Sequence, residues 1–380
     1  MSRPARFSGG LRRFFLLLTA AAVLLIATGG GIPSEVLEDV NGLPLWLLEE
    51  TAEPGKLVMM EYTSQTDKGT PAQAGVYLPY GYDPAGKYDV IILWPGTNGG
   101  TEIALTTEHK CRMEDKSCRK LSVVHILDRM IEQKLIRPVL VVCVEEITRS
   151  KLAVARVDLQ TVLDLVTENY ATYASDKTLS PAELRKHFAF MGFSQGAVYT
   201  QTLAMAEFFD RFANFVSISY GSRSPTGAKA MNESPYELGM LYFITGNDKD
   251  VGAETGGDAF RGILWRCPEK AQEGVNAIFR LAWFYIHDYA LIQVAMVDML
   301  PRIWPGKALT GGWQELSKKE GRRLDRFQPA GAVPGKQPRR GQAGAGGSSD
   351  EHMGDILRFF QHFGWDSASG SGGAPGQDAS

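Results

Sequence analysis

One stretch decides the fold: FAFMGFSQG, residues 188–196. Its apolar start, Phe188 to Met191, predicts a buried strand, and residues 197 to about 208 are expected to form a helix. A serine on a sharp turn between strand and helix exposes its hydroxyl, and the glycines of the G-x-S-x-G pattern leave space where strand and helix meet. The pattern alone is weak because the chain contains 41 glycines, but this setting indicates that Ser194 is a nucleophile.

Strand and helix signals alternate on both sides of this turn. Residues 57–62 and 74–78 predict a hairpin. Further strands are expected at residues 88–94, 138–144, 215–219, 240–245 and 277–283, and helices at 121–135, 154–170 and 290–300, the last ending at Pro301. Because repeated strand-helix-strand units force parallel pairing, we expect an α/β protein with three layers and a mostly parallel central sheet.

The two ends of the chain differ in composition from the middle. Arginines at positions 3, 6, 12 and 13 precede an uncharged run, residues 14–27, which is typical of a secretory signal over residues 1–30. We therefore expect export to the periplasm or the outside, with membrane attachment only if this segment stays uncleaved. Residues 305–380 predict a largely disordered, low-complexity tail with an amphipathic helix near residues 352–363. Residues 31–304 remain as the domain that would carry a site.

Composition argues against several partner and cofactor classes. The chain of 380 residues has 44% hydrophobic residues and a formal net charge of -3, so it lacks the basic field that nucleic acid requires. Its four cysteines form neither C-x-x-C nor a Cys/His cluster with zinc spacing, and we expect no metal and no cofactor. An exported chain could pair Cys111 with Cys118 around a surface loop, whereas Cys143 is expected to be buried in a strand.

A serine nucleophile needs a histidine base and a carboxylate that orients it. In this type of fold the acid and then the histidine follow the serine along the chain. The strand 240–245 runs into GNDKD, residues 246–250, which places carboxylates at the carboxyl edge of the sheet. Asp248 is the first choice and Asp250 the alternative, and both could instead be solvated turn residues.

Three histidines follow Ser194: His287, His352 and His362. His287 lies between a predicted strand and a predicted helix, in a loop that can present a base to the sheet edge. His352 follows a stretch expected to be disordered and would be poorly preorganised, so we prefer His287 and keep His352 as the alternative. Aromatic neighbours also leave open that His287 is a core histidine.

A developing oxyanion needs preformed amide donors. These are normally the residue after the nucleophile, here Gln195, and a residue in the loop after an earlier strand. Thr97 lies in such a loop, residues 94–100. This loop is rich in glycine but matches neither G-x-x-x-x-G-K-[ST] nor G-x-G-x-x-G, so a phosphate site is not indicated.

These segments resemble the α/β-hydrolase superfamily and, within it, the feruloyl esterase and esterase D-like carbohydrate esterases. The likeness covers roughly residues 56–304 and is carried by residues 76–82, 88–100, 135–144, 192–196, 246–248 and 287–288. The resemblance implies the α/β-hydrolase fold and a triad of Ser194, Asp248 and His287. Relatives often have His-Gly where residues 94–96 stand, and glycines where residues 284–286 stand, so this sequence departs from the pattern beside His287.

We therefore expect an exported serine esterase that acts by acyl transfer on a small or polysaccharide-linked ester. Feruloyl or acetyl esters of plant polysaccharides are the substrates that the resemblance implies. The alternatives are another serine hydrolase, such as a peptidase, a polyester depolymerase or an acyltransferase, and a non-catalytic glycan-binding or partner-binding protein with the same fold.

Overall fold

The computed structural model describes residues 42–64, 69–97, 99–145, 152–222, 224–246, 250, 252–282 and 284–307. These belong to the first of the two units into which the chain divides, Met1–Val333 and Pro334–Ser380. The predicted signal segment, the predicted tail from residue 308 onward and His352 all lie outside the described residues. Within the described part, no helix has both the length and the apolar character needed to span a bilayer.

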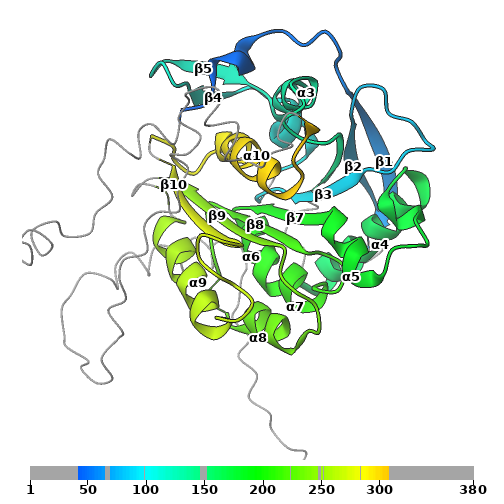
Figure 1. Ribbon diagram of the computed structural model, residues 1–380, viewed down its shortest axis with the longest axis vertical. Helices are drawn as coiled ribbons and strands as arrows, with labels where there is room; N and C mark the ends of the chain where they lie inside the picture. Colours follow the sequence, from blue (N-terminus) through cyan, green and yellow to red (C-terminus); the bar gives the residue numbers. More distant parts are fainter. Residues whose placement is uncertain are drawn as a thin grey trace, which may run out of the picture. The chain divides into compact units, whose positions relative to one another are not determined.

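An eight-stranded sheet forms the centre of the described unit (Figure 1). The strand order is β1-β2-β6-β3-β7-β8-β9-β10, and pairing is antiparallel between β1, β2 and β6 and parallel from β6 through β10. The strands are β1 (Lys56–Ser64), β2 (Thr70–Leu78), β3 (Asp89–Trp94), β6 (Val139–Val144), β7 (Phe188–Phe193), β8 (Asn214–Ile218), β9 (Met240–Gly246) and β10 (Ala277–Ala282). The predicted hairpin and the mostly parallel sheet are confirmed.

Helices cover both faces of this sheet, which confirms the three predicted layers (Figure 1). Every residue of β3 is buried; alternate residues Ile91 and Leu93 pack with one helical layer, and Val90 and Ile92 with the other. The first layer contains α3 (Val123–Glu132) and α10 (Ala290–Ile303). The second contains α4 (Leu152–Asn169), α6 (Gln195–Tyr199), α7 (Met205–Glu207), α8 (Thr226–Glu233) and α9 (Ala253–Arg266).

Two helices differ from the predictions. The helix expected after Ser194 consists of α6, a π-helical turn over Thr200–Ala204, and α7. The last helix does not end at Pro301 but continues to Ile303, because a proline in the final turn removes only one backbone hydrogen bond. The described residues continue to 307, and the Gly306 amide donates to the Leu135 carbonyl at 2.9 Å.

The suggested disulfide between Cys111 and Cys118 is absent, and all four cysteines are free thiols. These two residues lie on a hairpin of β4 (His109–Arg112) and β5 (Cys118–Leu121) that the sequence did not predict. Cys111 is paired with Arg119, one position away from Cys118, so the two side chains point to opposite faces. Cys111 is accordingly buried and Cys118 exposed, whereas Cys143 is buried in β6 as predicted.

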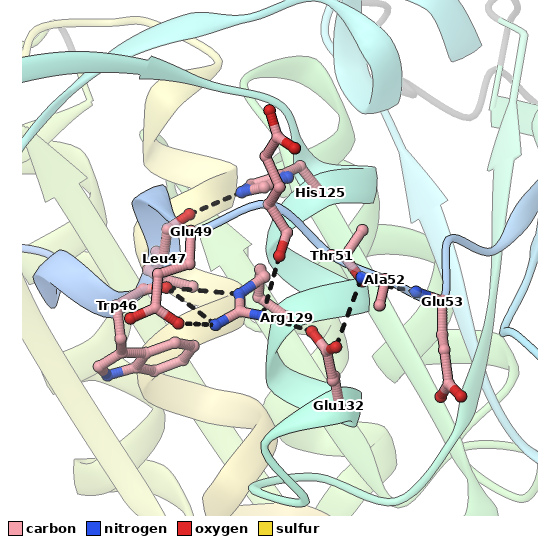
Figure 2. A network of polar contacts seen from close by, with 10 residues as sticks. Trp46, Leu47, Glu49, Thr51, Ala52, Glu53, His125, Arg129 and Glu132 are labelled. Carbon is pink, nitrogen blue, oxygen red and sulfur yellow. Dashed lines mark hydrogen bonds and ion pairs between the residues drawn. The ribbon is translucent and has the colours of Figure 1, made fainter.

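Arg129 anchors the segment before β1 onto α3 (Figure 2). Its side chain is almost fully buried, forms ion pairs with Glu49 and Glu132, and donates to the Trp46 carbonyl at 3.3 Å. One turn earlier in α3, the His125 ring bonds the Leu47 carbonyl at 2.6 Å. These contacts hold the 3₁₀ turn Leu45–Leu48 against the layer that also contains α10.

Candidate active site

Ser194 occupies a strained turn between β7 and α6. Its backbone angles are φ 55° and ψ −113°, a conformation that non-glycine residues adopt rarely and at an energetic cost. The Ser194 amide donates to the Ile218 carbonyl at 2.9 Å, which ties the turn to the neighbouring strand β8. The predicted strand-turn-helix setting is therefore present, and the strain lies on the residue whose hydroxyl it exposes.

The glycines two residues before and two residues after Ser194 are required because the backbone leaves no room for a side chain there. A Cβ atom at Gly192 would lie 1.9 Å from the Gly196 carbonyl oxygen, and one at Gly196 would lie 2.1 Å from the Trp94 carbonyl oxygen. Both obstructing atoms belong to the backbone, so they cannot move away as a side chain would.

Replacing Gly192 or Gly196 by alanine is expected to lower the free energy of unfolding by about 3 kcal/mol, because the added methyl group forces the strand and helix apart. Urea denaturation monitored by circular dichroism measures this. Gly257→Ala in α9 is the control, since a Cβ there meets its nearest atom, on the Arg261 side chain, at 3.4 Å. Equal stability of Gly192→Ala and Gly257→Ala would contradict the account of the turn.

His287 connects Ser194 to a buried carboxylate. Its Nε2 lies 2.8 Å from the Ser194 Oγ, and its Nδ1 lies 3.0 Å from Asp250 Oδ1. Because an ionised carboxylate can only accept, Nδ1 carries the proton and Nε2 is left to accept from the serine hydroxyl. The three side chains come from the carboxyl ends of β7, β9 and β10, where open α/β sheets gather their ligands.

The carboxylate beside His287 is Asp250, the alternative from the sequence, in place of Asp248. Asp248 itself lies outside the described residues. The amides of Gly246, the last residue of β9, and of Gly252 both donate to the Asp250 carboxylate, at 2.7 and 2.9 Å. These bonds hold the buried carboxylate beside His287, and the motif itself does not reveal them.

Four donors stabilise the charge on Asp250. Burial alone would raise the pKa of this fully enclosed carboxyl, but hydrogen bonds from His287, Ser219, Gly252 and Gly246 outweigh it and hold the pKa below its usual value of 3.8. Asp250 is therefore ionised at neutral pH.

The lowered pKa of Asp250 predicts a loss of stability in acid. A carboxyl whose folded pKa is depressed contributes stability above the unfolded value, and this is lost as the pH falls below 3.8 through the folded pKa. We expect the unfolding free energy of Asp250→Asn to fall less than that of the wild type between pH 5 and pH 2. Urea unfolding across this range measures both slopes, and identical slopes would contradict the assignment.

Bulky residues before His287 are accommodated by the β4–β5 hairpin. The Tyr285 hydroxyl accepts from the Arg112 amide at 2.9 Å, and the Arg112 guanidinium lies 3.7 Å from the centre of the Phe284 ring. Phe284 itself has a φ of 71°. The loop is thus held by contacts instead of glycine turns, which explains how residues 284–286 differ from the family pattern while His287 still reaches Ser194.

The loop after β3 packs directly on the serine turn. A Cβ at Gly96 would lie 2.9 Å from Ser194 Cβ, and the Thr97 hydroxyl donates to Gln195 Oε1 at 2.7 Å. Gln195 is the first residue of α6, so no carbonyl four residues earlier in the helix is available to its amide. The two residues predicted to supply oxyanion donors are therefore joined by their side chains.

Farther along the same loop, Glu145 fixes the backbone. Its Oε1 accepts from the Thr101 amide at 3.1 Å, while the Thr101 hydroxyl accepts from the Gly75 amide at 3.0 Å. Sequence reasoning missed this support because the residues come from three separated parts of the chain: the middle of β2, the segment after β3 and the end of β6.

Replacing Thr97 by valine is expected to lower kcat for ester hydrolysis about tenfold, since the loop loses the hydrogen bond that aligns it with Gln195. Thr97→Ser keeps the hydroxyl and should retain nearly the wild-type kcat. Steady-state kinetics of the two variants measure the difference, and a wild-type kcat in Thr97→Val would show that this bond does not align the loop.

The described residues contain no group of three or more His, Cys, Asp and Glu side chains that could hold a metal ion. The arrangement of Ser194, His287 and Asp250 is instead suited to moving a proton from a hydroxyl to an imidazole.

Comparison with known proteins relates this geometry to the α/β-hydrolase fold. No protein-family model matches the chain. It is 28% identical over 220 residues to endo-1,4-beta-xylanase Y of Acetivibrio thermocellus, a match that covers 53% of this chain and only 18% of that protein.

Two solved structures show the fold similarity directly. One is a serine-to-alanine mutant of the feruloyl esterase module of Clostridium thermocellum, complexed with sinapinate, with 22% identity, a TM-score of 0.53, and coverage of 69% of this chain and 92% of that one. The other, abbreviated FAE, has 23% identity, a TM-score of 0.56, and coverage of 70% and 93%. The chain has the α/β-hydrolase fold, and the resemblance to feruloyl esterases is confirmed for the fold.

Proposed function

We propose that this protein is a serine carboxylic-ester hydrolase. The observation that carries the proposal is the pair of hydrogen bonds from Ser194 Oγ to His287 Nε2 at 2.8 Å and from His287 Nδ1 to Asp250 at 3.0 Å. A serine hydroxyl at neutral pH becomes a useful nucleophile only when a base is positioned to take its proton. Here that base lies at hydrogen-bonding distance and is oriented by a buried carboxylate.

In the proposed reaction, Ser194 Oγ attacks the ester carbonyl while His287 Nε2 takes the hydroxyl proton. Asp250 stabilises the imidazolium that forms, and the amides of Thr97 and Gln195 donate to the oxyanion. The proton then passes from His287 to the leaving alcohol, whose departure gives the acyl-enzyme. Water repeats the sequence through His287 and releases the acid, so no cofactor takes part.

We propose esters of hydroxycinnamic acids as the substrate class. The related feruloyl esterase module was solved with sinapinate, a compound of this class. In this chain, Phe284 and Ile286 are 50% and 54% exposed, so the loop that carries His287 also carries exposed apolar side chains. The alcohol is proposed to be small or linked to a polysaccharide, and export of the protein rests on the composition of residues 1–30.

Hydrolysis of methyl ferulate, methyl sinapate and p-nitrophenyl acetate tests this function. The wild type should release ferulate and sinapate, detected by chromatography, and Ser194→Ala should not. A peptidase would instead cleave a peptide library and leave methyl ferulate and methyl sinapate intact. A non-catalytic binding protein would hydrolyse none of them, and either result would overturn the proposal.

A further inference from the structure

Backbone strain in the described residues gathers around the candidate site. Five described non-glycine residues have a positive φ, and three of them lie within two residues of the end of a strand of the central sheet: Ser194 at 55°, Ser219 at 60° and Phe284 at 71°. Such conformations persist only where surrounding contacts impose them, and they often mark functional positions. Ser194 carries the hydroxyl and Phe284 belongs to the His287 loop, whereas Ser219 has no role in the reaction as described so far.

Ser219 is fully buried and contacts the carboxylate from the side opposite His287. Its hydroxyl donates to Asp250 Oδ2 at 2.6 Å, while His287 bonds Oδ1. The other two donors to this carboxylate are the backbone amides of Gly246 and Gly252. Ser219 and His287 are thus the two side chains that hold the two oxygens of Asp250, which fixes the plane of the carboxylate.

The backbone of Ser219 is held in place independently of its hydroxyl. Its amide donates to the Ile244 carbonyl at 2.7 Å, which joins the end of β8 to β9. A Cβ at Gly252 would lie only 1.7 Å from the Ser219 carbonyl oxygen, so the turn that carries Asp250 packs directly on this residue. Glycine would suit the positive φ better than serine, but it would leave Asp250 Oδ2 without a side-chain donor.

We propose that Ser219 is a positioning residue for the proton transfer and acts through Asp250. The inference rests on the proposed function. Its hydroxyl fixes the carboxylate so that Oδ1 faces His287 Nδ1, and the strained backbone is the cost of placing a donor there.

Two substitutions separate the hydroxyl from the strain. Ser219→Ala removes the hydroxyl and keeps the strain, whereas Ser219→Gly removes both. We expect both variants to lose about tenfold in kcat with little change in KM, and Ser219→Gly to melt at the same or a higher temperature than Ser219→Ala. If kcat falls while Ser219→Gly remains as stable as the wild type, the lost hydroxyl acts by positioning Asp250 and not by stabilising the fold.

The pH profile gives a readout that a purely structural residue would not change. Without the hydroxyl, more of the negative charge on Asp250 is available to His287, so the imidazolium is favoured and the acid limb of kcat should move to higher pH. The control is Ser217→Ala in β8, which loses an equally buried hydroxyl that donates to the Tyr220 carbonyl at 2.9 Å. Ser217→Ala should keep the wild-type acid limb.

The Nδ1 proton of His287 provides a test that does not depend on activity. We expect its downfield proton NMR resonance, present in the wild type, to shift or broaden in both Ser219 variants but not in Ser217→Ala. Unchanged resonance, kcat and acid limb in the Ser219 variants would overturn the inference. A wild type that hydrolyses no ester would instead overturn the proposed function, and the resonance would still decide the role of Ser219.

Discussion

Replacement of Ser194 by alanine is expected to lower kcat for ester hydrolysis by about 10⁴-fold or more. The substitution removes the atom that forms the acyl-enzyme, and no other described hydroxyl is bonded to His287. The fold should remain, because alanine has the size of the serine without its oxygen and the turn is held by the Ser194 amide and the adjacent glycines. Initial rates with methyl ferulate, together with a thermal melt of each protein, measure both expectations.

Ser175→Ala is the matched control for this experiment. Ser175 lies in the 3₁₀ turn Tyr173–Ser175 and donates to the Thr172 carbonyl at 2.9 Å, away from the strand ends that carry the site. It should keep the wild-type rate. A Ser194→Ala variant that retains more than a tenth of the wild-type rate would rule out Ser194 as the nucleophile.

Replacement of Asp250 by asparagine is the second large effect, with an expected loss of about 10³-fold to 10⁴-fold in kcat. Asp250 accepts from four donors, two on each oxygen, whereas an asparagine has one accepting oxygen and one donating NH₂ group. With the NH₂ group facing His287, Nδ1 must accept, so the ring proton moves to Nε2 and the base can no longer take the Ser194 proton.

The opposite orientation of the asparagine is also unfavourable. The NH₂ group would then face the Gly246 amide, and two donors would meet inside the protein without an acceptor. In both orientations the NH₂ group meets a glycine amide, Gly252 in the first and Gly246 in the second, so the urea unfolding midpoint should fall in either case. Only the first orientation also reverses the His287 tautomer, and kcat reports that change. Asp248→Asn is the matched control, and we expect it to keep most of the activity. An equal loss in both variants would contradict the assignment of Asp250.

Much of the fold was accessible from the sequence because the parallel strands are buried on both faces. Apolar runs such as residues 139–144 and 188–193 therefore predicted strands correctly. Helix α9 escaped prediction because it contains Gly256, whose missing side chain allows close packing: a Cβ there would lie 2.7 Å from Thr245 Cγ2. The charged β4–β5 hairpin gave no apolar alternation to recognise.

The candidate site was predictable only in part, for reasons of backbone path. Chain order and strand ends led to Ser194 and His287, and the structure brings these two residues within hydrogen-bonding distance. Asp248 and Asp250 lie two residues apart in the sequence, so the choice between them depends on which carboxylate the amides of Gly246 and Gly252 hold beside His287. Ser219 carried no sequence signal, because its importance comes from a positive φ and a contact 31 residues along the chain.

Reaction with a fluorophosphonate probe, followed by peptide mass spectrometry, tests the central claim most directly. Such a probe modifies a serine that a neighbouring imidazole has activated. The account predicts one modified residue, Ser194, and a loss of that modification when His287 is replaced by alanine. A folded wild-type protein in which Ser194 stays unmodified, or one labelled equally well without His287, would contradict it.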